Sequence, residues 1–117
     1  MNPYLDKQYN PHVKIEILLA NWIIVDCLVD TGFSGGIALP KRFREGFHQK
    51  PVLYQRYELA DGSFTSFSLY ETEVKFKSTT RGITLFFTKS SEGLVGIEFL
   101  TGFKLVLDLK KFLVMIE

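Results

Sequence analysis

The sequence predicts a single all-β domain, and three observations support this prediction. About eight short apolar runs follow one another at regular spacing, which is the pattern of a β-barrel or a β-sandwich. Turn residues separate these runs, and helical stretches are few and short. The chain has 117 residues, of which 46% are hydrophobic and 23% charged, so it can form one core. Residues 1–12 are expected to form an N-terminal tail, and residues 13–117 the domain.

The first half of the chain predicts three strands. Apolar and polar residues alternate over 13–19, which indicates a half-buried strand. Residues 22–29 are almost continuously apolar, as in a strand that is covered on both faces. A short third strand is expected over 37–39, where Pro40 ends it. Because proline is well placed at the start of a helix, one or two helical turns are expected over 41–47.

The second half predicts a long hairpin followed by short elements. The runs 52–59 and 64–76 are extended, and Asp61-Gly62 between them is a strong hairpin-turn signal. Residues 78–82 are interpreted as the next turn. The remaining elements are expected to be strands over 83–88, 94–95, 105–107 and 112–116, and one helical turn over 97–100.

Composition argues against several classes of protein. Lys and Arg number 14 and Asp and Glu 13, a near balance that argues against a nucleic-acid or membrane partner. The single cysteine, Cys27, excludes an intrachain disulfide and a cysteine-based zinc site, and is expected to be a buried small hydrophobe. His12 and His48 form no metal motif and are interpreted as surface or turn residues. No signal-peptide pattern is found, and the apolar stretch 17–25 is too short to span a bilayer, so a cytoplasmic protein is expected.

The segment VDCLVDTGFSGG, residues 25–36, holds the clearest chemical signal. Asp30 stands at the end of an apolar strand, where a carboxylate is costly unless donors or another titratable group meet it. The Thr31 hydroxyl and the backbone N–H groups of a turn that contains Gly32 are suitable donors. Asp-Thr-Gly also occurs by chance in roughly 2–3% of chains of this length. The tripeptide alone therefore leaves a functional site and a plain turn both open.

Three segments together resemble the retropepsin-like aspartic proteases, including their bacterial single-domain members. Residues 25–39, VDCLVDTGFSGGIAL, resemble the active-site strand and loop of that family. Residues 94–100, LVGIEFL, resemble the segment and short helix that close its ψ-shaped loop. Residues 59–63, LADGS, resemble its flap hairpin. The segments occur in the family's order, and the resemblance extends over roughly residues 13–110, so it is more specific than Asp-Thr-Gly alone.

The resemblance implies an all-β acid-protease barrel with a ψ-loop and one short helix. It also implies an aspartic endopeptidase that cuts protein or peptide substrates and uses no metal or cofactor. Because the chain has one Asp-Thr-Gly and the reaction needs two carboxylates, a symmetric homodimer is implied, with one Asp30 from each chain. The implied residues fall into two groups: catalytic Asp30, Thr31 and Gly32, and substrate-binding Phe33, Ser34, Ala60, Asp61, Gly62 and Gly96.

One departure from the family pattern leaves alternatives open. Retroviral members usually carry Ala after Asp-Thr-Gly, whereas this chain has Phe33, which could fill part of the cleft or pack into the core. A non-catalytic dimeric peptide-binding module is therefore an alternative, as is a chain that works only beside a partner that supplies the second Asp. Asp61 is interpreted as a turn residue, and Asp26 as exposed or salt-bridged. The apolar run 112–116 is expected to be buried in the core or between chains.

Overall fold

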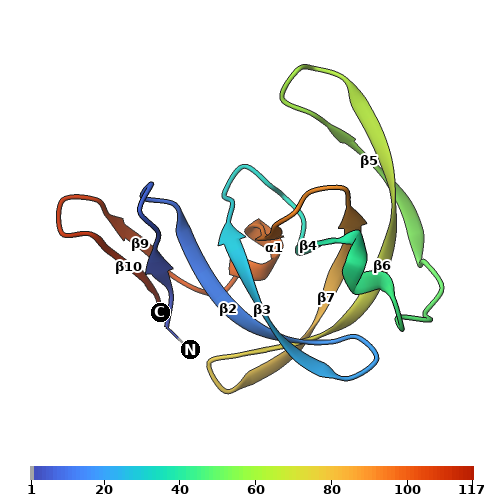
Figure 1. Ribbon diagram of the computed structural model, residues 1–117, viewed down its shortest axis with the longest axis horizontal. Helices are drawn as coiled ribbons and strands as arrows, with labels where there is room; N and C mark the ends of the chain where they lie inside the picture. Colours follow the sequence, from blue (N-terminus) through green and yellow to red (C-terminus); the bar gives the residue numbers. More distant parts are fainter. Residues whose placement is uncertain (1) are drawn as a thin grey trace.

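The computed structural model describes residues 2–117 and shows an all-β barrel with one short α-helix (Figure 1). Eight strands form one sheet in the order β1-β2-β3-β8-β4-β7-β6-β5, and an additional pairing of β2 with β6 closes the barrel. A separate hairpin follows the helix. The elements are β1 (Tyr4–Leu5), β2 (Pro11–Leu18), β3 (Trp22–Val29), β4 (Ile37–Pro40), a 3₁₀ turn η1 (Lys41–Arg44), β5 (Leu53–Glu58), β6 (Phe64–Phe76), β7 (Thr79–Thr88), β8 (Gly93–Val95), α1 (Ile97–Leu100), β9 (Leu105–Asp108) and β10 (Leu113–Ile116).

The structure confirms the predicted fold class and corrects some local expectations. Residues 4–5 form β1 and β2 begins at Pro11, so part of the segment 1–12 belongs to the sheet. The predicted turn over 78–82 is wrong, because β7 begins at Thr79. The chain turns at Lys77 and Ser78 instead, with φ angles of 50° and 64°. These values suit a two-residue type I′ hairpin turn, which usually contains Asn or Gly and was therefore not recognisable.

Strand β8 lies between β3 and β4 and produces the ψ-shaped arrangement. It runs parallel to β3, with Val29 opposite Val95, and antiparallel to β4, with Ile37 opposite Val95. The segment that joins β3 to β4, residues 30–36, must therefore pass around the end of β8. This places Asp30 next to the start of α1.

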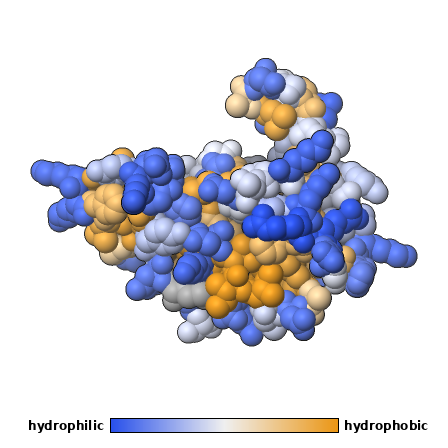
Figure 2. Space-filling view, viewed as in Figure 1, coloured by the Kyte–Doolittle hydropathy of each residue, from blue (hydrophilic) through white to orange (hydrophobic). Residues whose placement is uncertain are grey.

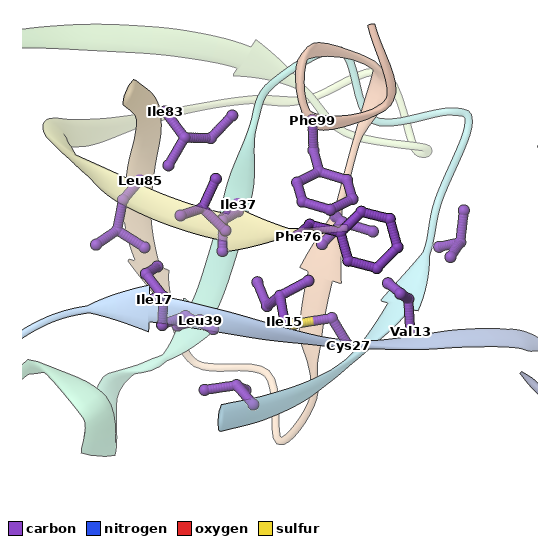
Figure 3. Packing of buried hydrophobic residues seen from close by; sticks show 14 of the residues in the cluster. Val13, Ile15, Ile17, Cys27, Ile37, Leu39, Phe76, Ile83, Leu85 and Phe99 are labelled. Carbon is purple, nitrogen blue, oxygen red and sulfur yellow. The ribbon is translucent and has the colours of Figure 1, made fainter. Parts of the chain in front are cut away.

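The core fills the barrel and follows from the alternation on its strands (Figure 3). On β2 the side chains of Val13, Ile15 and Ile17 are fully buried, as their period of two predicts. Phe99 of α1 is fully buried and belongs to the same core cluster. Cys27 is buried as expected, and burial raises the pKa of its thiol to about 12, so the thiol stays protonated.

Two hairpins extend from the barrel. The β5–β6 hairpin forms a long curved arm, and the β9–β10 hairpin lies at the opposite side, near both chain ends (Figure 1). Figure 2 shows the arm standing clear of the body, with apolar atoms at its end. Residues 58–64 at the end of this arm are all exposed. Within residues 2–117, no helix is long and apolar enough to cross a membrane.

A cluster of polar side chains ties β1 to β2 and β3. The two ring nitrogens of His12 lie 2.9 Å from Asp6 Oδ2 and 2.9 Å from Asp26 Oδ1. Tyr4 stacks on the imidazole with ring centroids 4.8 Å apart, and its hydroxyl donates to Asp26. Only a doubly protonated imidazole can donate to two carboxylates at once, so this geometry favours charged His12. His12 is therefore not the ordinary surface residue that was expected, whereas Asp26 is salt-bridged as expected.

The ionisation of His12 is expected to make stability depend on pH. Burial lowers the pKa of His12, but the hydrogen bonds with Asp6 and Asp26 outweigh burial and raise it above 6.5. A folded-state pKa above the unfolded value adds stability that is complete below pH 6.5 and lost as the pH rises through the folded value. The urea concentration at which half of the chains are unfolded should therefore decrease as the pH is raised from about 6 to about 9. The His12→Gln variant should not show this decrease.

The matched control is His48→Gln, because His48 is exposed. This variant should keep the pH dependence of the unmodified chain. If the urea midpoint depends on pH equally in the unmodified chain and in His12→Gln, the contacts of His12 do not cause the pH dependence of stability.

Candidate active site

Asp30 lies at the first position after β3 and is held by the backbone around it. Its N–H donates to the carbonyl oxygen of Val95 on β8, at 2.9 Å. The N–H of Gly32 donates to Asp30 Oδ1, also at 2.9 Å, and the N–H of Phe33 donates to the Asp30 carbonyl oxygen at 3.1 Å. Asp30 is half-buried as a residue, and Thr31 and Gly32 are exposed. The tight turn thus fixes one carboxylate oxygen by a backbone donor, as the sequence led us to expect.

The start of α1 supports the Asp30 loop, residues 30–36, from behind. The N–H of Gly96 donates to Gly36 O at 2.9 Å, that of Ile97 to Phe33 O at 2.8 Å, and that of Glu98 to Gly35 O at 3.1 Å. The N–H groups of a first helical turn have no partner within the helix, and here loop carbonyls supply one. A Cβ at Gly96 would lie 2.4 Å from the carbonyl oxygens of both Gly35 and Phe33. Gly96 is buried and braces the loop from behind, outside the cavity described next.

A cleft of about 800 Å³ lies between the Asp30 loop and the β5–β6 arm. The loop contributes Asp30, Gly32, Phe33 and Ser34 to its lining, and the arm contributes residues 55–60. The structure therefore brings five of the expected site residues to one cavity, namely Asp30, Gly32, Phe33, Ser34 and Ala60. No group of three or more His, Cys, Asp or Glu side chains in residues 2–117 is arranged to hold a metal ion.

Three solved structures of proteases resemble this chain in fold. A retropepsin-like aspartic protease from Rickettsia conorii superposes with a TM-score of 0.70 at 17% sequence identity, covering 99% of this chain and 88% of that one. EIAV protease in complex with the inhibitor HBY-793 gives a TM-score of 0.62 at 17% identity, covering 87% of this chain and 97% of that one. The protease of simian foamy virus (mac) gives a TM-score of 0.56 at 13% identity, covering 76% of this chain and 90% of that one.

The chain has the retropepsin-like fold. This confirms, for the fold, the resemblance of the Asp30 loop, the ψ-loop segment and the flap hairpin. No protein-family model matches the chain, and no curated protein matches it by sequence. We call the β5–β6 arm the flap from here on, because it occupies the flap position of the fold.

Phe33 packs at the base of the cleft rather than in the main core. Its ring contacts Phe86 of β7 edge-on at 5.4 Å and Tyr57 of the flap at 6.2 Å between centroids. Phe67 of β6 lies 4.5 Å from Phe86 and completes a group of four rings. This aromatic group, Phe33, Tyr57, Phe67 and Phe86, belongs to a second apolar cluster apart from the barrel core. The departure from the family pattern thus shapes the cleft lining.

The tip of the flap is a tight turn that Asp61 and Gly62 build. The N–H of Gly62 donates to Leu59 O at 2.9 Å, and Gly62 has a φ of +84°, which favours glycine. The carboxylate of Asp61 accepts hydrogen bonds from the hydroxyl and the N–H of Ser63, and these lower its pKa. Asp61 and Gly62 are exposed and do not line the cleft of this single chain. The arrangement favours the turn interpretation of Asp61.

Sequence reasoning missed ten of the residues that line the cleft, among them three aromatic ones, Tyr57, Phe67 and Phe86. Their positions within predicted strands were clear, but apolar residues on strands are ordinarily core residues. The long-range pairing of β4 with β7 and the curl of the flap bring them next to Phe33. No local signal in the sequence indicates this meeting.

Proposed function

We propose that this chain is an aspartic endopeptidase that acts as a symmetric homodimer, with one Asp30 from each chain. The observation that carries the proposal is the position of Asp30, half-buried, held by a backbone donor, and placed in a cleft beneath a flap. The chain contains a single Asp-Thr-Gly. Peptide hydrolysis by aspartic proteases needs two carboxylates that share a proton, so a second chain must supply the other.

In the proposed reaction the two Asp30 side chains take different roles. The ionised one removes a proton from a water molecule, whose oxygen attacks the carbonyl carbon of the peptide bond. The protonated one donates to the carbonyl oxygen as the tetrahedral intermediate forms. Collapse of the intermediate breaks the C–N bond, restores the carbonyl and passes a proton to the leaving amine. Because the pair must hold one proton between its two carboxyl groups, activity should be highest on the acid side of neutral.

The neighbouring residues have supporting roles in this proposal. Thr31 is exposed beside Asp30, where its hydroxyl can brace the contact between the two chains. The substrate lies extended in the cleft and pairs its backbone with the flap, a form of strand addition. The flap tip, exposed residues 58–64, would cover the bound substrate. This segment includes the expected binding residues Ala60, Asp61 and Gly62.

The β9–β10 hairpin supports the proposal of a dimer. On β10, Val114 and Ile116 are buried, whereas Leu113 and Met115 are 39% and 37% exposed. One face of the hairpin therefore packs on its own chain, and the other presents apolar side chains to the surroundings. An apolar face on a terminal hairpin suits a contact with a second copy of the chain.

The double variant Leu113→Ser, Met115→Ser is expected to weaken the dimer by about tenfold or more in Kd, because it removes apolar side chains from its contact. Sedimentation equilibrium over a range of chain concentrations measures the change. Ile24→Ser, at a residue that is 60% exposed on β3, is the matched control and should leave the dimer intact. Equal dissociation of the double variant and the control would place the dimer contact elsewhere.

A non-catalytic peptide-binding module with the same fold is the second candidate. The specific observation in its favour is the ring of Phe33, which fills space at the base of the cleft. This candidate predicts peptide binding without turnover.

A peptide library decides between the two candidates. The purified chain and its Asp30→Asn variant are incubated with the library between about pH 4 and pH 7, and the products are sequenced by mass spectrometry. Cuts that only the unmodified chain makes support the endopeptidase. Peptide binding by both proteins without any cut, from a sample confirmed as a dimer, supports the binding module.

A further inference from the structure

The first strand of the flap has one side chain, that of Tyr57, that packs on the barrel. Strand β5 is the edge of the sheet and pairs only with β6. Every residue of β5 is exposed except Tyr57. A two-stranded hairpin is only marginally stable in water, so the position of this arm depends on what its side chains contact. Tyr57 is therefore the place where the structure can hold or release the flap.

The ring of Tyr57 packs among three other rings. It stacks on Phe86 with centroids 5.2 Å apart and planes 27° apart, and it lies 5.9 Å from Phe67 of the neighbouring strand. Phe67 stands diagonally across from Tyr57, because Tyr57 pairs with Thr65 and Gln55 with Phe67. Aromatic pairs of this geometry add stability beyond the area they bury. Strand β6 pairs with β7 only over residues 70–76, so beyond that ladder the flap packs on Phe86 of β7 through its two inward-facing rings.

Tyr57 also contacts the Asp30 loop directly through Phe33, at 6.2 Å between centroids. The chain seats the Phe33 ring on two glycines: a Cβ at Gly35 would lie 2.6 Å from its Cζ, and a Cβ at Gly96 2.6 Å from its Cδ2. The same Cβ at Gly35 would lie 3.2 Å from the hydroxyl oxygen of Tyr57. The ring of Phe33 therefore cannot shift into the loop. A movement of Tyr57 would change the packing of Phe33 and, through it, the Asp30 loop.

We propose that Tyr57 is a positioning residue that couples the flap to the Asp30 loop, with its ring packed on Phe33 as the coupling contact. The flap is then already positioned over the cleft that contains Asp30 when a peptide enters. The consequence for substrate recognition rests on the proposed endopeptidase function. The anchoring of the flap does not, and can be measured in a chain that cuts nothing.

The test compares three variants on the same strand. Tyr57→Ala removes the ring, Tyr57→Phe keeps it, and Tyr54→Ala removes an identical side chain that is 75% exposed. The first readout is hydrogen exchange of the flap-tip amides of Leu59 and Gly62, which are hydrogen-bonded within the turn. The second is KM and kcat for a peptide that the unmodified chain cuts.

We expect Tyr57→Ala to speed exchange of the flap amides by about tenfold and to raise KM by a similar factor, with a smaller change in kcat. Tyr57→Phe should match the unmodified chain in flap exchange, and Tyr54→Ala should match it in both readouts. Phe33→Ala tests the same contact from the loop side, and its effect on flap exchange should not add to that of Tyr57→Ala.

Two results would overturn the proposal. One is equal flap exchange in Tyr57→Ala and Tyr54→Ala. The other is flap exchange that is as fast in Tyr57→Phe as in Tyr57→Ala, which would assign the effect to the hydroxyl rather than to the ring. If no peptide is cut but Tyr57→Ala still releases the flap, the endopeptidase proposal fails and the anchor stands.

Discussion

Asp30→Asn is expected to lower kcat for peptide cleavage by at least about a thousandfold while the chain stays folded and dimeric. An amide can neither remove a proton from water nor share one with the second side chain. It can still accept the hydrogen bond that the N–H of Gly32 donates to Oδ1 at 2.9 Å. The loop should therefore keep its shape, and the loss should appear in kcat under conditions where the unfolding midpoint is unchanged.

Asp108→Asn is the matched control for this variant. Asp108 is the last residue of β9 and its carboxylate also accepts hydrogen bonds from backbone N–H groups, those of Lys110 at 3.1 Å and Lys111 at 3.0 Å, but it lies in the β9–β10 hairpin. The control should keep full activity. Activity that survives in Asp30→Asn, or that is lost equally in both variants, would contradict the role assigned to Asp30.

Gly96→Ala is expected to destabilise the chain by about 3 kcal/mol or more. The added Cβ would lie 2.4 Å from two backbone carbonyl oxygens of the Asp30 loop, and neither can move without breaking its hydrogen bond to α1. Because these bonds hold the loop against the helix, the strain should loosen the site as well. Denaturant unfolding measures the free energy of unfolding. The rate of peptide cleavage reports whether the Asp30 loop keeps its active geometry.

Gly82→Ala provides the comparison for this second variant. Gly82 lies on β7, and a Cβ there would meet nothing closer than the carbonyl oxygen of Thr72 at 3.9 Å. Its stability should be equal to or slightly above that of the unmodified chain, since alanine restricts the unfolded chain more than glycine. A loss below about 1 kcal/mol in Gly96→Ala would show that the contact between loop and helix is softer than its geometry indicates.

Features with a strong local signal were predictable from the sequence. Alternation on β2 indicated a half-buried strand, which the structure confirms. The continuous apolar run over 22–29 also forms a strand, but the expectation that both of its faces are covered is wrong, because Ile24 on β3 is 60% exposed. The family resemblance of the Asp-Thr-Gly and Leu-Val-Gly segments implied the ψ-loop, and Asp61-Gly62 indicated the hairpin turn. Each of these signals is contained within a few neighbouring residues, where turn chemistry and side-chain periodicity act directly.

Features that depend on distant contacts were not predictable. The raised pKa of His12 arises only because the fold brings Asp6 and Asp26 to its two ring nitrogens. The aromatic group in the cleft forms from four separate segments, and no periodicity within any one of them distinguishes Tyr57 from an ordinary strand residue. The turn at Lys77 and Ser78 was missed for a different reason, because neither residue favours a positive φ.

The most direct test of the account mixes unmodified chains with Asp30→Asn chains by refolding them together in varied proportions. If one site needs two Asp30 side chains, only dimers of two unmodified chains cut peptide, so activity follows the square of the unmodified fraction. An equal mixture should then keep about one quarter of the activity per total chain. Activity proportional to the unmodified fraction, about one half in the equal mixture, would mean that each chain holds a complete site and would contradict the shared dyad.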